Sequence, residues 1–237
     1  MLTIVFDLDG TLIDTAPDLI STLNLILARE GMPDVPYDAA RRLIGGGARG
    51  MIERALAAEG RPPSKADLDR MFNAFIEHYA AHIADRSRPF PKLGPALDRL
   101  AQDGRRLAVC TNKLEWLSVR LLDALQLTPH FAAICGQDTF GVMKPDPKIL
   151  QQTILRAGGN PAEAIMVGDS GTDVRTARAA NVPVIAVDFG YSEVPIATLE
   201  PDRLIGSFAD LPAVIDELVS ERLQADVIER QQSPRQG

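Results

Sequence analysis

The stretch Val5-Phe6-Asp7-Leu8-Asp9-Gly10-Thr11 decides the fold of this chain. The run that leads into it, Leu2-Thr3-Ile4-Val5-Phe6, is apolar and β-branched, which predicts a strand buried in a parallel sheet rather than an alternating surface strand. This strand ends at two carboxylates and a glycine. Ligands of open α/β sheets bind just beyond the carboxyl ends of the strands. Asp7 and Asp9 are therefore placed where a substrate would bind.

The spacing of these two carboxylates favours a bound cation. Asp7 and Asp9 lie two residues apart, so in an extended segment their side chains share one face and repel each other. Mg²⁺ suits such a position, because proteins hold it with one or two carboxylates together with substrate phosphate oxygens. Gly10 permits a tight turn close to a ligand. Taken alone, the Asp-x-Asp pattern also fits a charged turn after a strand, and other parts of the chain must decide.

Composition sets the broad class of protein. The chain has 237 residues, 46% of them hydrophobic, which allows one large domain or a domain with a smaller insert. The net charge of −7 argues against a nucleic-acid or anionic-membrane partner, whereas a local cation can still attract an anionic substrate. Cys110 and Cys135 lie in apolar runs and are expected to be buried free thiols in a reducing compartment. With no basic leader before Asp7 and no long apolar run, we expect a cytoplasmic protein without a signal peptide or membrane span.

A helical insert follows the first strand. Residues 15–30 have a helical apolar pattern, and Thr15 with Asp18 resembles a capping box at its start. No strand signal appears before residue 88, so we expect a small helical cap domain over residues 15–85. Its other helices are predicted at residues 38–43, 49–58 and 66–84. The glycines between the first two of these, Gly45-Gly46-Gly47, permit tight backbone geometry beside a ligand and also fit an ordinary loop.

The rest of the chain alternates between strands and helices. This alternation predicts a parallel sheet with helices on both faces, a Rossmann-like α/β/α core of three layers made from residues 1–14 and 86–237. Residues 231–237 are polar, and we expect a disordered tail there. Further strands are predicted at 106–110, 131–135, 164–167, 182–187 and 203–205, and helices at 94–103, 115–126, 147–157, 173–180 and 211–223.

Polar residues collect at one edge of this predicted sheet. Thr111 follows the second strand, Asp169 and Asp173 follow the fourth, and Lys144 precedes a helix. A carboxylate nucleophile, carboxylates for a metal, a hydroxyl and a lysine are the groups that phosphoryl transfer requires. Singly, Thr111 could end a strand, Lys144 could be solvated and Asp173 could cap a helix. Their occurrence together at the edge that holds Asp7 favours a site.

In these motifs the chain resembles the haloacid dehalogenase superfamily of phosphotransferases. The motifs are Asp7-Leu8-Asp9-Gly10-Thr11, Cys110-Thr111-Asn112-Lys113, Lys144-Pro145-Asp146-Pro147 and Gly168-Asp169-Ser170-Gly171-Thr172-Asp173. They stand in the superfamily's order and cover nearly the whole chain, and the helical insert resembles its smaller cap domain. Within the superfamily the chain is most similar to the phosphoglycolate phosphatase group, in the cap loop Ile44-Gly45-Gly46-Gly47-Ala48-Arg49, in Thr111-Asn112-Lys113, and in Gly190-Tyr191 followed by Glu200-Pro201-Asp202.

The resemblance implies a role for each catalytic residue. Asp7 would attack phosphorus and form an aspartyl phosphate, and Asp9 would be the general acid and base. Mg²⁺ would be held by Asp7, Asp169 and the backbone carbonyl of Asp9. The phosphoryl oxygens would be bound by Thr111, Asn112 and Lys144.

The resemblance also implies supporting and specificity roles. Asp173 and Thr11 would support the site without binding the metal directly. Gly46, Gly47, Arg49 and Lys113 are hypothetical specificity residues. Arg49, near the start of a predicted helix, is the residue we expect to bind a substrate carboxylate.

Several other functions share part of this pattern. A sugar-phosphate phosphatase or phosphomutase, a pyrophosphatase and a nucleotidase share all the core motifs and remain open. A dehalogenase would not need Asp9, a phosphonate hydrolase would need a buried cap lysine where only Lys65 occurs, and an inactive phosphate-binding regulator would not need the intact acids. The expected partner is a small phosphorylated metabolite, not nucleic acid or a membrane. The expected assembly is a monomer or a homodimer.

Overall fold

A six-stranded parallel sheet forms the centre of the protein in this computed structural model, which describes residues 1–232 and the side chains up to residue 224. The strand order is β5-β4-β1-β6-β7-β8, so β1 lies in the middle of the sheet. The register pairs Phe6 of β1 with Val109 of β4 and Val167 of β6, which brings the ends of these three strands to one edge. The strands are β1 (Thr3–Phe6), β4 (Arg106–Cys110), β5 (Ala133–Cys135), β6 (Ala164–Gly168), β7 (Val184–Val187) and β8 (Arg203–Ile205).

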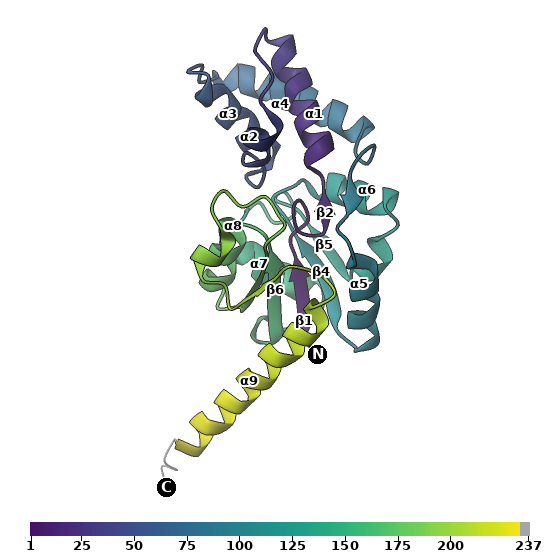
Figure 1. The fold of residues 1–237 in the computed structure, drawn as a ribbon, viewed down its shortest axis with the longest axis vertical. Coiled ribbons are helices and arrows are strands. Elements are labelled where there is room, and N and C mark those ends of the chain that lie inside the picture. Colours follow the sequence, from purple (N-terminus) through teal and green to yellow (C-terminus); the bar gives the residue numbers. More distant parts are fainter. Residues whose placement is uncertain (233–237) are drawn as a thin grey trace.

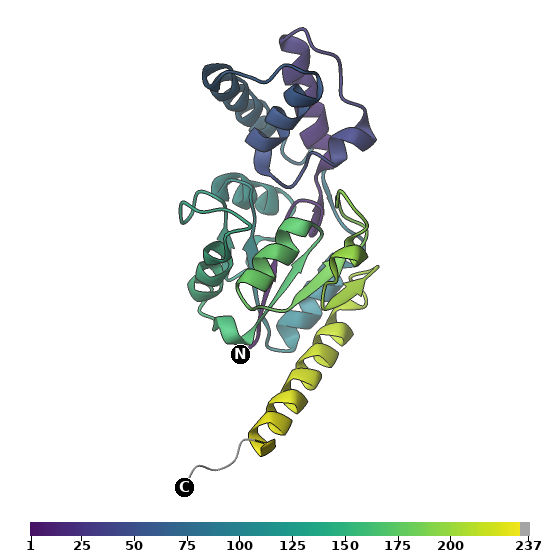
Figure 2. The same cartoon turned by 90° about the vertical axis from the view of Figure 1, so that its left-hand side faces the viewer.

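Helices cover both faces of the sheet and make the predicted three layers (Figures 1 and 2). Side chains alternate along β1, so Ile4 and Phe6 pack into one apolar cluster and Val5 into the other. The first cluster receives the apolar faces of α5, α6 and α9, and the second those of α7 and α8. These helices are α5 (Leu93–Gln102), α6 (Glu115–Ala124), α7 (Pro147–Arg156), α8 (Gly171–Ala179) and α9 (Leu211–Gln232), with short 3-10 turns at Thr128–His130, Pro161–Glu163 and Ile196–Leu199.

A second lobe of helices lies beyond the carboxyl edge of the sheet (Figure 1). Its helices α1 and α4 pack against each other, as do α3 and α4, and bury Phe75 and Tyr79 almost completely. The lobe joins the sheet through a two-stranded antiparallel ribbon, β2 (Ile13–Asp14) and β3 (Arg88–Pro89). Both connections therefore pass through one narrow hinge. The helices of this cap lobe are α1 (Ala16–Arg29), α2 (Tyr37–Arg41), α3 (Gly47–Ala58) and α4 (Lys65–Ala81).

The predicted capping box at the start of α1 is wrong. Thr15 is the N-cap residue, but its side chain makes no cap hydrogen bond. Asp18 instead accepts hydrogen bonds from the backbone N–H groups of Arg86 and Ser87 and from the Ser87 hydroxyl. This buried carboxylate ties one hinge connection to the other across 69 residues of sequence.

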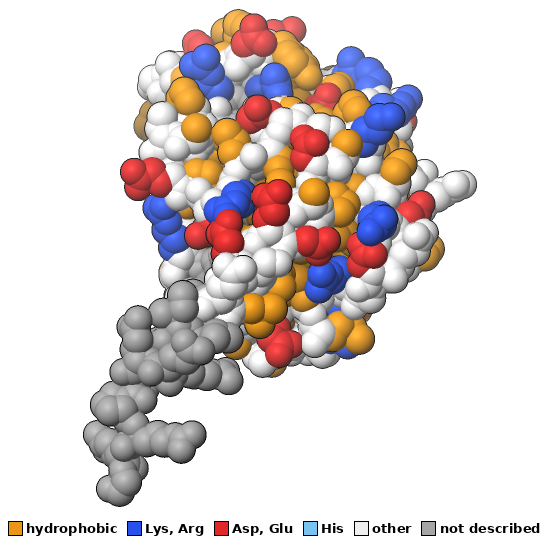
Figure 3. Space-filling view, turned by 60° about the horizontal axis from the view of Figure 1, so that its bottom comes forward, with side chains coloured by type: hydrophobic (Ala, Val, Ile, Leu, Met, Phe, Trp, Pro, Cys, Tyr) orange, Lys and Arg blue, Asp and Glu red, His pale blue; other side chains and the backbone are white. Residues whose placement is uncertain are grey.

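The C-terminal helix extends past the predicted helix end. Helix α9 runs to Gln232 and projects from the sheet away from the cap lobe (Figure 1). The predicted tail thus begins inside this helix at residues 231 and 232, and the remainder, residues 233–237, lies outside the described residues. Within the part that is described, every helix is too short or too polar to cross a bilayer. On the face in Figure 3, basic and acidic side chains of the described residues are interspersed, so that face carries no broad field of one sign.

Candidate active site

The turn after β1 places Asp7 and Asp9 at the carboxyl edge of the sheet. The Asp7 backbone N–H continues the sheet by donating to Val167, and the Leu8 carbonyl then accepts from Leu12 and Ile13 to close a tight turn. Gly10 adopts a φ of +87° in this turn. A Cβ at this position would lie 2.4 Å from a carboxylate oxygen of Asp169. The glycine is therefore needed both for the backbone conformation and for the close approach of the two loops.

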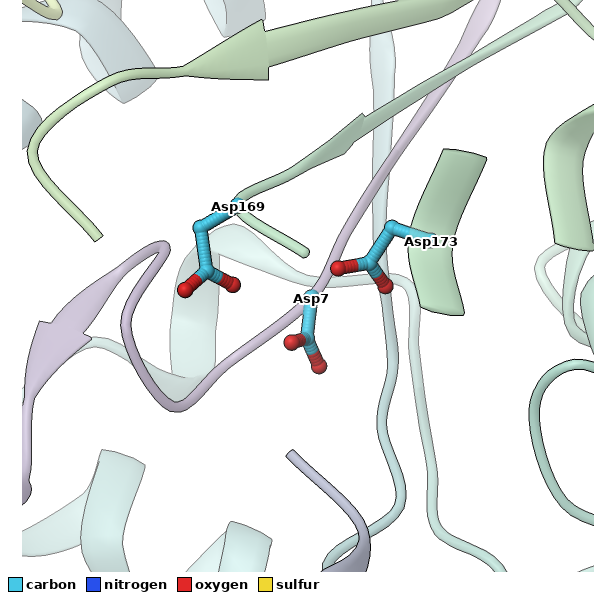
Figure 4. Close-up of side chains that lie close together, drawn as sticks. All are labelled: Asp7, Asp169 and Asp173. Atoms are coloured by element: carbon cyan, nitrogen blue, oxygen red, sulfur yellow. The ribbon is translucent and has the colours of Figure 1, made fainter. Parts of the chain in front are cut away.

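Three buried carboxylates converge at this edge (Figure 4). Asp7 comes from the end of β1, Asp169 follows β6 and Asp173 lies in the first turn of α8, and one oxygen of each lies within 4.8 Å of the others. Burial raises the pKa of Asp7 to about 6, although the nearby Lys144 ammonium opposes the shift. Burial, with added repulsion from Asp173 and Asp7, raises the pKa of Asp169 to about 8. Such a cluster disfavours its own ionisation, and a divalent cation among these oxygens would restore it.

Lys144 is the buried cation of the cluster. Its Nζ lies 2.7 Å from Asp7 and 2.6 Å from Asp173, and 2% of its side chain is exposed. Burial by itself would lower the pKa of Lys144, but the carboxylates of Asp173 and Asp7 outweigh burial and raise it above its ordinary value. Lys144 therefore stays charged at neutral pH. One lysine facing three carboxylates leaves an excess of negative charge that suits a metal ion.

The oxygens of Asp173 and Asp169 have different partners. Asp173 pairs with Lys144 through one oxygen and accepts from the Ser170 hydroxyl and N–H through the other, which completes a capping box at the start of α8. Within the described residues, Asp169 accepts from two neutral donors, the Thr11 hydroxyl at 3.1 Å and the Tyr191 backbone N–H at 2.6 Å. Both Asp173 oxygens thus have partners within the site, whereas Asp169 has no cation beside it among the described residues, and a metal ion could supply one to Asp169 and Asp7.

Asn112 holds Lys144 in place through the backbone. Its amide oxygen accepts from the Lys144 N–H at 2.8 Å, and its amide nitrogen donates to the carbonyls of Lys144 and Gly45. In this arrangement both ends of the amide contact backbone groups, so Asn112 positions Lys144, and its contact with a phosphate stays a prediction. The bond to Gly45 also links the sheet edge to the cap loop.

Thr111 and Lys113 follow β4 on the same loop. The Thr111 hydroxyl accepts from the Lys113 backbone N–H at 3.2 Å, which leaves its own proton for a ligand. The Lys113 ammonium pairs with Asp9 at 3.1 Å and donates to the hydroxyl of Tyr79 at 2.9 Å. Tyr79 belongs to α4, so this pair of contacts joins the core to the cap.

A cavity between the two lobes contains these groups. On the core side it is lined by Asp7, Asp9, Thr111, Asn112 and Lys113. The cap side is mainly apolar and includes the loop residues Gly45 and Gly47. Gly47 has a φ of +72°, and a Cβ there would lie 3.0 Å from the backbone oxygen of Asn112. The cap side is formed by Leu19, Ile44, Ala48, Met51, Phe72, Phe75, Ile76 and Tyr79.

Arg49 and Gly46 are not brought to this cavity. The Arg49 guanidinium pairs with Asp69 at 2.6 Å, stacks over Phe72 and leaves 43% of its side chain exposed. Gly46 is the N-cap of α3, and a Cβ there would meet the side chain of Arg54. Of the four hypothetical specificity residues, Gly47 and Lys113 line the cavity.

Two tyrosines that are not among the predicted site residues contact the site. Tyr79 belongs to an aromatic helix pattern that predicts a packed core. The signal for a polar role is its hydroxyl, because a buried tyrosine hydroxyl usually has a hydrogen-bond partner. Tyr191 donates its backbone N–H to Asp169, and its hydroxyl donates to Asp14 at 2.5 Å and accepts from the Ala16 N–H. Tyr191 thereby connects the carboxylate cluster with the hinge of the cap.

Comparison with known proteins agrees with this geometry. Residues 4–187 match the model of the haloacid dehalogenase-like hydrolase family, and the chain belongs to that family, which confirms the resemblance of its motifs. A phosphoglycolate phosphatase of Mesorhizobium japonicum is 50% identical over 214 residues, which cover 90% of this chain and 94% of that relative.

Two solved structures extend the similarity to the fold. A protein described as a predicted phosphoglycolate phosphatase from Haemophilus somnus superimposes with a TM-score of 0.84 at 27% identity, covering 91% of this chain and 98% of that one. CbbY from Rhodobacter sphaeroides, solved in complex with phosphate, has a TM-score of 0.74 at 26% identity, covering 89% and 96%. Both likenesses agree with the predicted α/β core and helical cap.

Proposed function

We propose that this protein hydrolyses the phosphate ester of 2-phosphoglycolate to glycolate and inorganic phosphate through an aspartyl phosphate on Asp7. One observation carries the proposal. Asp7 lines a cavity between core and cap, and its neighbours Lys144 and Asp169 are buried beside it. A largely buried carboxylate that lines a cavity is suited to covalent catalysis.

The groups around Asp7 suit a phosphoryl group. The Thr111 hydroxyl has a free proton to donate, and the Lys144 ammonium is held beside Asp7 in a buried, charged state. Both would bind phosphoryl oxygens and offset the charge that develops during transfer. Asn112 serves this step indirectly, because it fixes the backbone of Lys144.

The carboxylate cluster fits Mg²⁺. Asp7 and Asp169 would hold the ion with the backbone carbonyl of Asp9, and Asp173 would keep Lys144 in position. Hard oxygen donors of this kind suit Mg²⁺, which retains several waters and shares phosphate oxygens. When bound, the ion neutralises negative charge between the Asp7 carboxylate and the phosphoryl group.

Asp7 is the nucleophile, and Asp9 transfers a proton in each of the two chemical steps. An Asp7 carboxylate oxygen forms a bond to phosphorus while the bond from phosphorus to the glycolate oxygen breaks, and Asp9 donates a proton to that oxygen. Asp9 then accepts a proton from the water that attacks the aspartyl phosphate, which releases inorganic phosphate and restores Asp7. The Asp9 side chain lines the same cavity as Asp7, as this exchange requires.

The choice of phosphoglycolate is supported by the named relative that shares half of its residues with this chain. A cytoplasmic location is supported by Cys110 and Cys135, which lie opposite each other on β4 and β5 yet are buried and free. Burial raises the pKa of Cys110 to about 12, so this thiol is unreactive.

A phosphate-release screen tests the proposal. Purified protein with Mg²⁺ is assayed on phosphoglycolate, hexose phosphates, pyrophosphate and nucleotides, and the Asp7→Asn variant prepared in parallel measures contaminating phosphatase. We expect the highest kcat/KM for phosphoglycolate and none above background for the variant. A higher kcat/KM for any other member of the panel would refute phosphoglycolate as the preferred substrate.

A further inference from the structure

Lys113 is the ammonium group that reaches into the cavity. Its side chain is 5% exposed, and its Nζ donates to both oxygens of Asp9, at 3.1 and 3.2 Å, and to the Tyr79 hydroxyl at 2.9 Å. It also lies 4.4 Å from the centre of the Tyr79 ring, within the range of a cation–π contact. A core lysine is thus held between a core carboxylate and a cap phenol at the wall of the cavity.

Few other groups in the cavity could pair with an anionic group of the substrate other than its phosphate. Among the described residues that line it, Lys113 is the one with a cationic side chain, and most of the cap wall is hydrocarbon. Arg49, the cation predicted from sequence to serve the cap, points instead to Asp69. An anionic group that enters an apolar-walled cavity must be paired to offset the loss of its hydration.

The position of Lys113 matches the shape of phosphoglycolate. Lys113 touches Asp9, the residue assigned to protonate the ester oxygen of the leaving group. In phosphoglycolate a single methylene separates that oxygen from the carboxylate. A substrate whose ester oxygen contacts Asp9 therefore has its carboxylate within reach of the ammonium that Asp9 holds. An ammonium has three N–H donors, and Lys113 directs two of them at the Asp9 carboxylate and one at Tyr79. One of the two donors on Asp9 is sufficient to keep that pair, so the other can turn to the substrate carboxylate.

We propose that Lys113 binds the carboxylate of the substrate and that Tyr79 positions its ammonium from the cap. This inference rests on the proposed function, because it assigns the specificity of that same site. It places the recognition of the carboxylate on the core, two residues after Thr111. The cap contributes one hydroxyl and an apolar wall.

Two substrates that differ by the carboxylate test this assignment. Ethyl phosphate has a methyl group in place of the carboxylate of phosphoglycolate, so the ratio of their kcat/KM values isolates carboxylate recognition from phosphoryl transfer. Lys113→Met removes the charge and keeps much of the side-chain volume. Lys148→Met, at an exposed lysine on α7, is the matched control. A hydrogen bond to a charged group is worth about 1.5–3 kcal/mol, so Lys113→Met should lower the ratio by roughly 10–100-fold and the control should leave it unchanged.

The ratio of kcat/KM for phosphoglycolate to kcat/KM for ethyl phosphate separates carboxylate binding by Lys113 from its contact with Asp9. Loss of the support that Lys113 gives Asp9 would slow both substrates equally and leave the ratio intact. Tyr79→Phe removes only the positioning hydroxyl, and we expect a smaller fall in the ratio, about 2–10-fold, that appears mainly in KM for phosphoglycolate. If Lys113→Met does not fold, Lys113→Gln keeps hydrogen-bonding groups near Tyr79 and should show the same loss of the ratio.

The possible failures can be told apart. A wild-type protein with no preference for phosphoglycolate over ethyl phosphate would refute the proposed function and this inference together. A wild-type preference that survives both Lys113 variants would refute the inference and leave the function standing. A preference that is lost in Arg49→Ala instead would assign the carboxylate to the cap and also overturn the role of Lys113.

Discussion

The Asp18→Ala variant tests how the cap is attached to the core. Asp18 lies in the first turn of α1 and is 4% exposed, and its carboxylate accepts hydrogen bonds from the opposite hinge connection. The Ser87 N–H donates at 2.8 Å, the Ser87 hydroxyl at 2.7 Å and the Arg86 N–H at about 3 Å. The variant leaves these donors without their acceptor.

The size of the effect follows from burial. Ser87 is fully buried, so both of its donors lose bonds to a charged acceptor at about 1.5–3 kcal/mol each, whereas the Arg86 N–H is only partly buried and can bind water. We expect Asp18→Ala to lower the free energy of unfolding by about 3–6 kcal/mol. An acid that acts only on the dipole of its helix would contribute about 0.3–1 kcal/mol.

Urea denaturation measures this difference. Asp38 is an exposed acid in the first turn of α2, so Asp38→Ala is the matched control for a helix-dipole effect. Ser87→Ala removes one hydrogen bond to the charged acceptor and keeps both backbone donors, and should cost about 1.5–3 kcal/mol. The m-value is recorded for each variant, because independent unfolding of the cap would change it. A cost for Asp18→Ala no larger than that for Asp38→Ala would refute the hinge role.

The other predictions concern chemistry and metal. Asp9→Asn should lower kcat for phosphoglycolate by roughly 10²–10⁴, and lower it less for p-nitrophenyl phosphate, whose leaving group needs less protonation; an equal loss on both would contradict the general-acid role. Ca²⁺, which favours more oxygens at longer distances, should inhibit in competition with activating Mg²⁺, and initial rates at varied concentrations of both ions decide this; activity that persists in excess chelator would remove the metal from the account. Without metal, in the presence of chelator, the pKa is raised to about 6 for Asp7 and to about 8 for Asp169. The folded protein therefore keeps protons on these carboxyl groups at pH values where the unfolded chain, with carboxyl pKa values near 3.8, has released them. Stability should therefore fall as pH rises from about 4 to 8, and Mg²⁺ should raise the melting temperature more at about pH 8 than at about pH 5.5; a pH-independent Mg²⁺ effect would contradict this.

The sheet and its catalytic edge could be predicted because their signals are local. Each buried strand is a short apolar run followed by polar residues, and parallel strands bring those residues to a common edge. Asp7, Thr111, Lys144 and Asp169 were predicted there, and the structure places them there. Strand ends differ from the prediction by one or two residues, as hydrogen-bonded boundaries usually do.

The features that could not be predicted depend on contacts between distant segments. The ribbon of β2 and β3 has two residues in each strand, too few for any periodicity. Asp18 matched a local capping pattern, but its partners lie in the second hinge connection. The direction of the Arg49 side chain depends on the packing of α3 against α4, which no local pattern encodes.

The link between Lys113 and Tyr79 is the clearest case. Sequence placed Lys113 at the sheet edge beside Thr111 and placed Tyr79 in the apolar stripe of a cap helix. Their contact at 2.9 Å follows only from the way the cap folds over the core. Their separation of 34 positions along the chain carries no signal of this contact.

Trapping the covalent intermediate is the sharpest test of Asp7 as the nucleophile. Protein mixed with Mg²⁺ and phosphoglycolate labelled in the phosphoryl group is quenched in acid within one turnover, digested and mapped. We expect label on the peptide that contains Asp7, released by hydroxylamine as an acyl phosphate would be, and no label in Asp7→Asn. Label on another residue, or full turnover by Asp7→Asn, would contradict it.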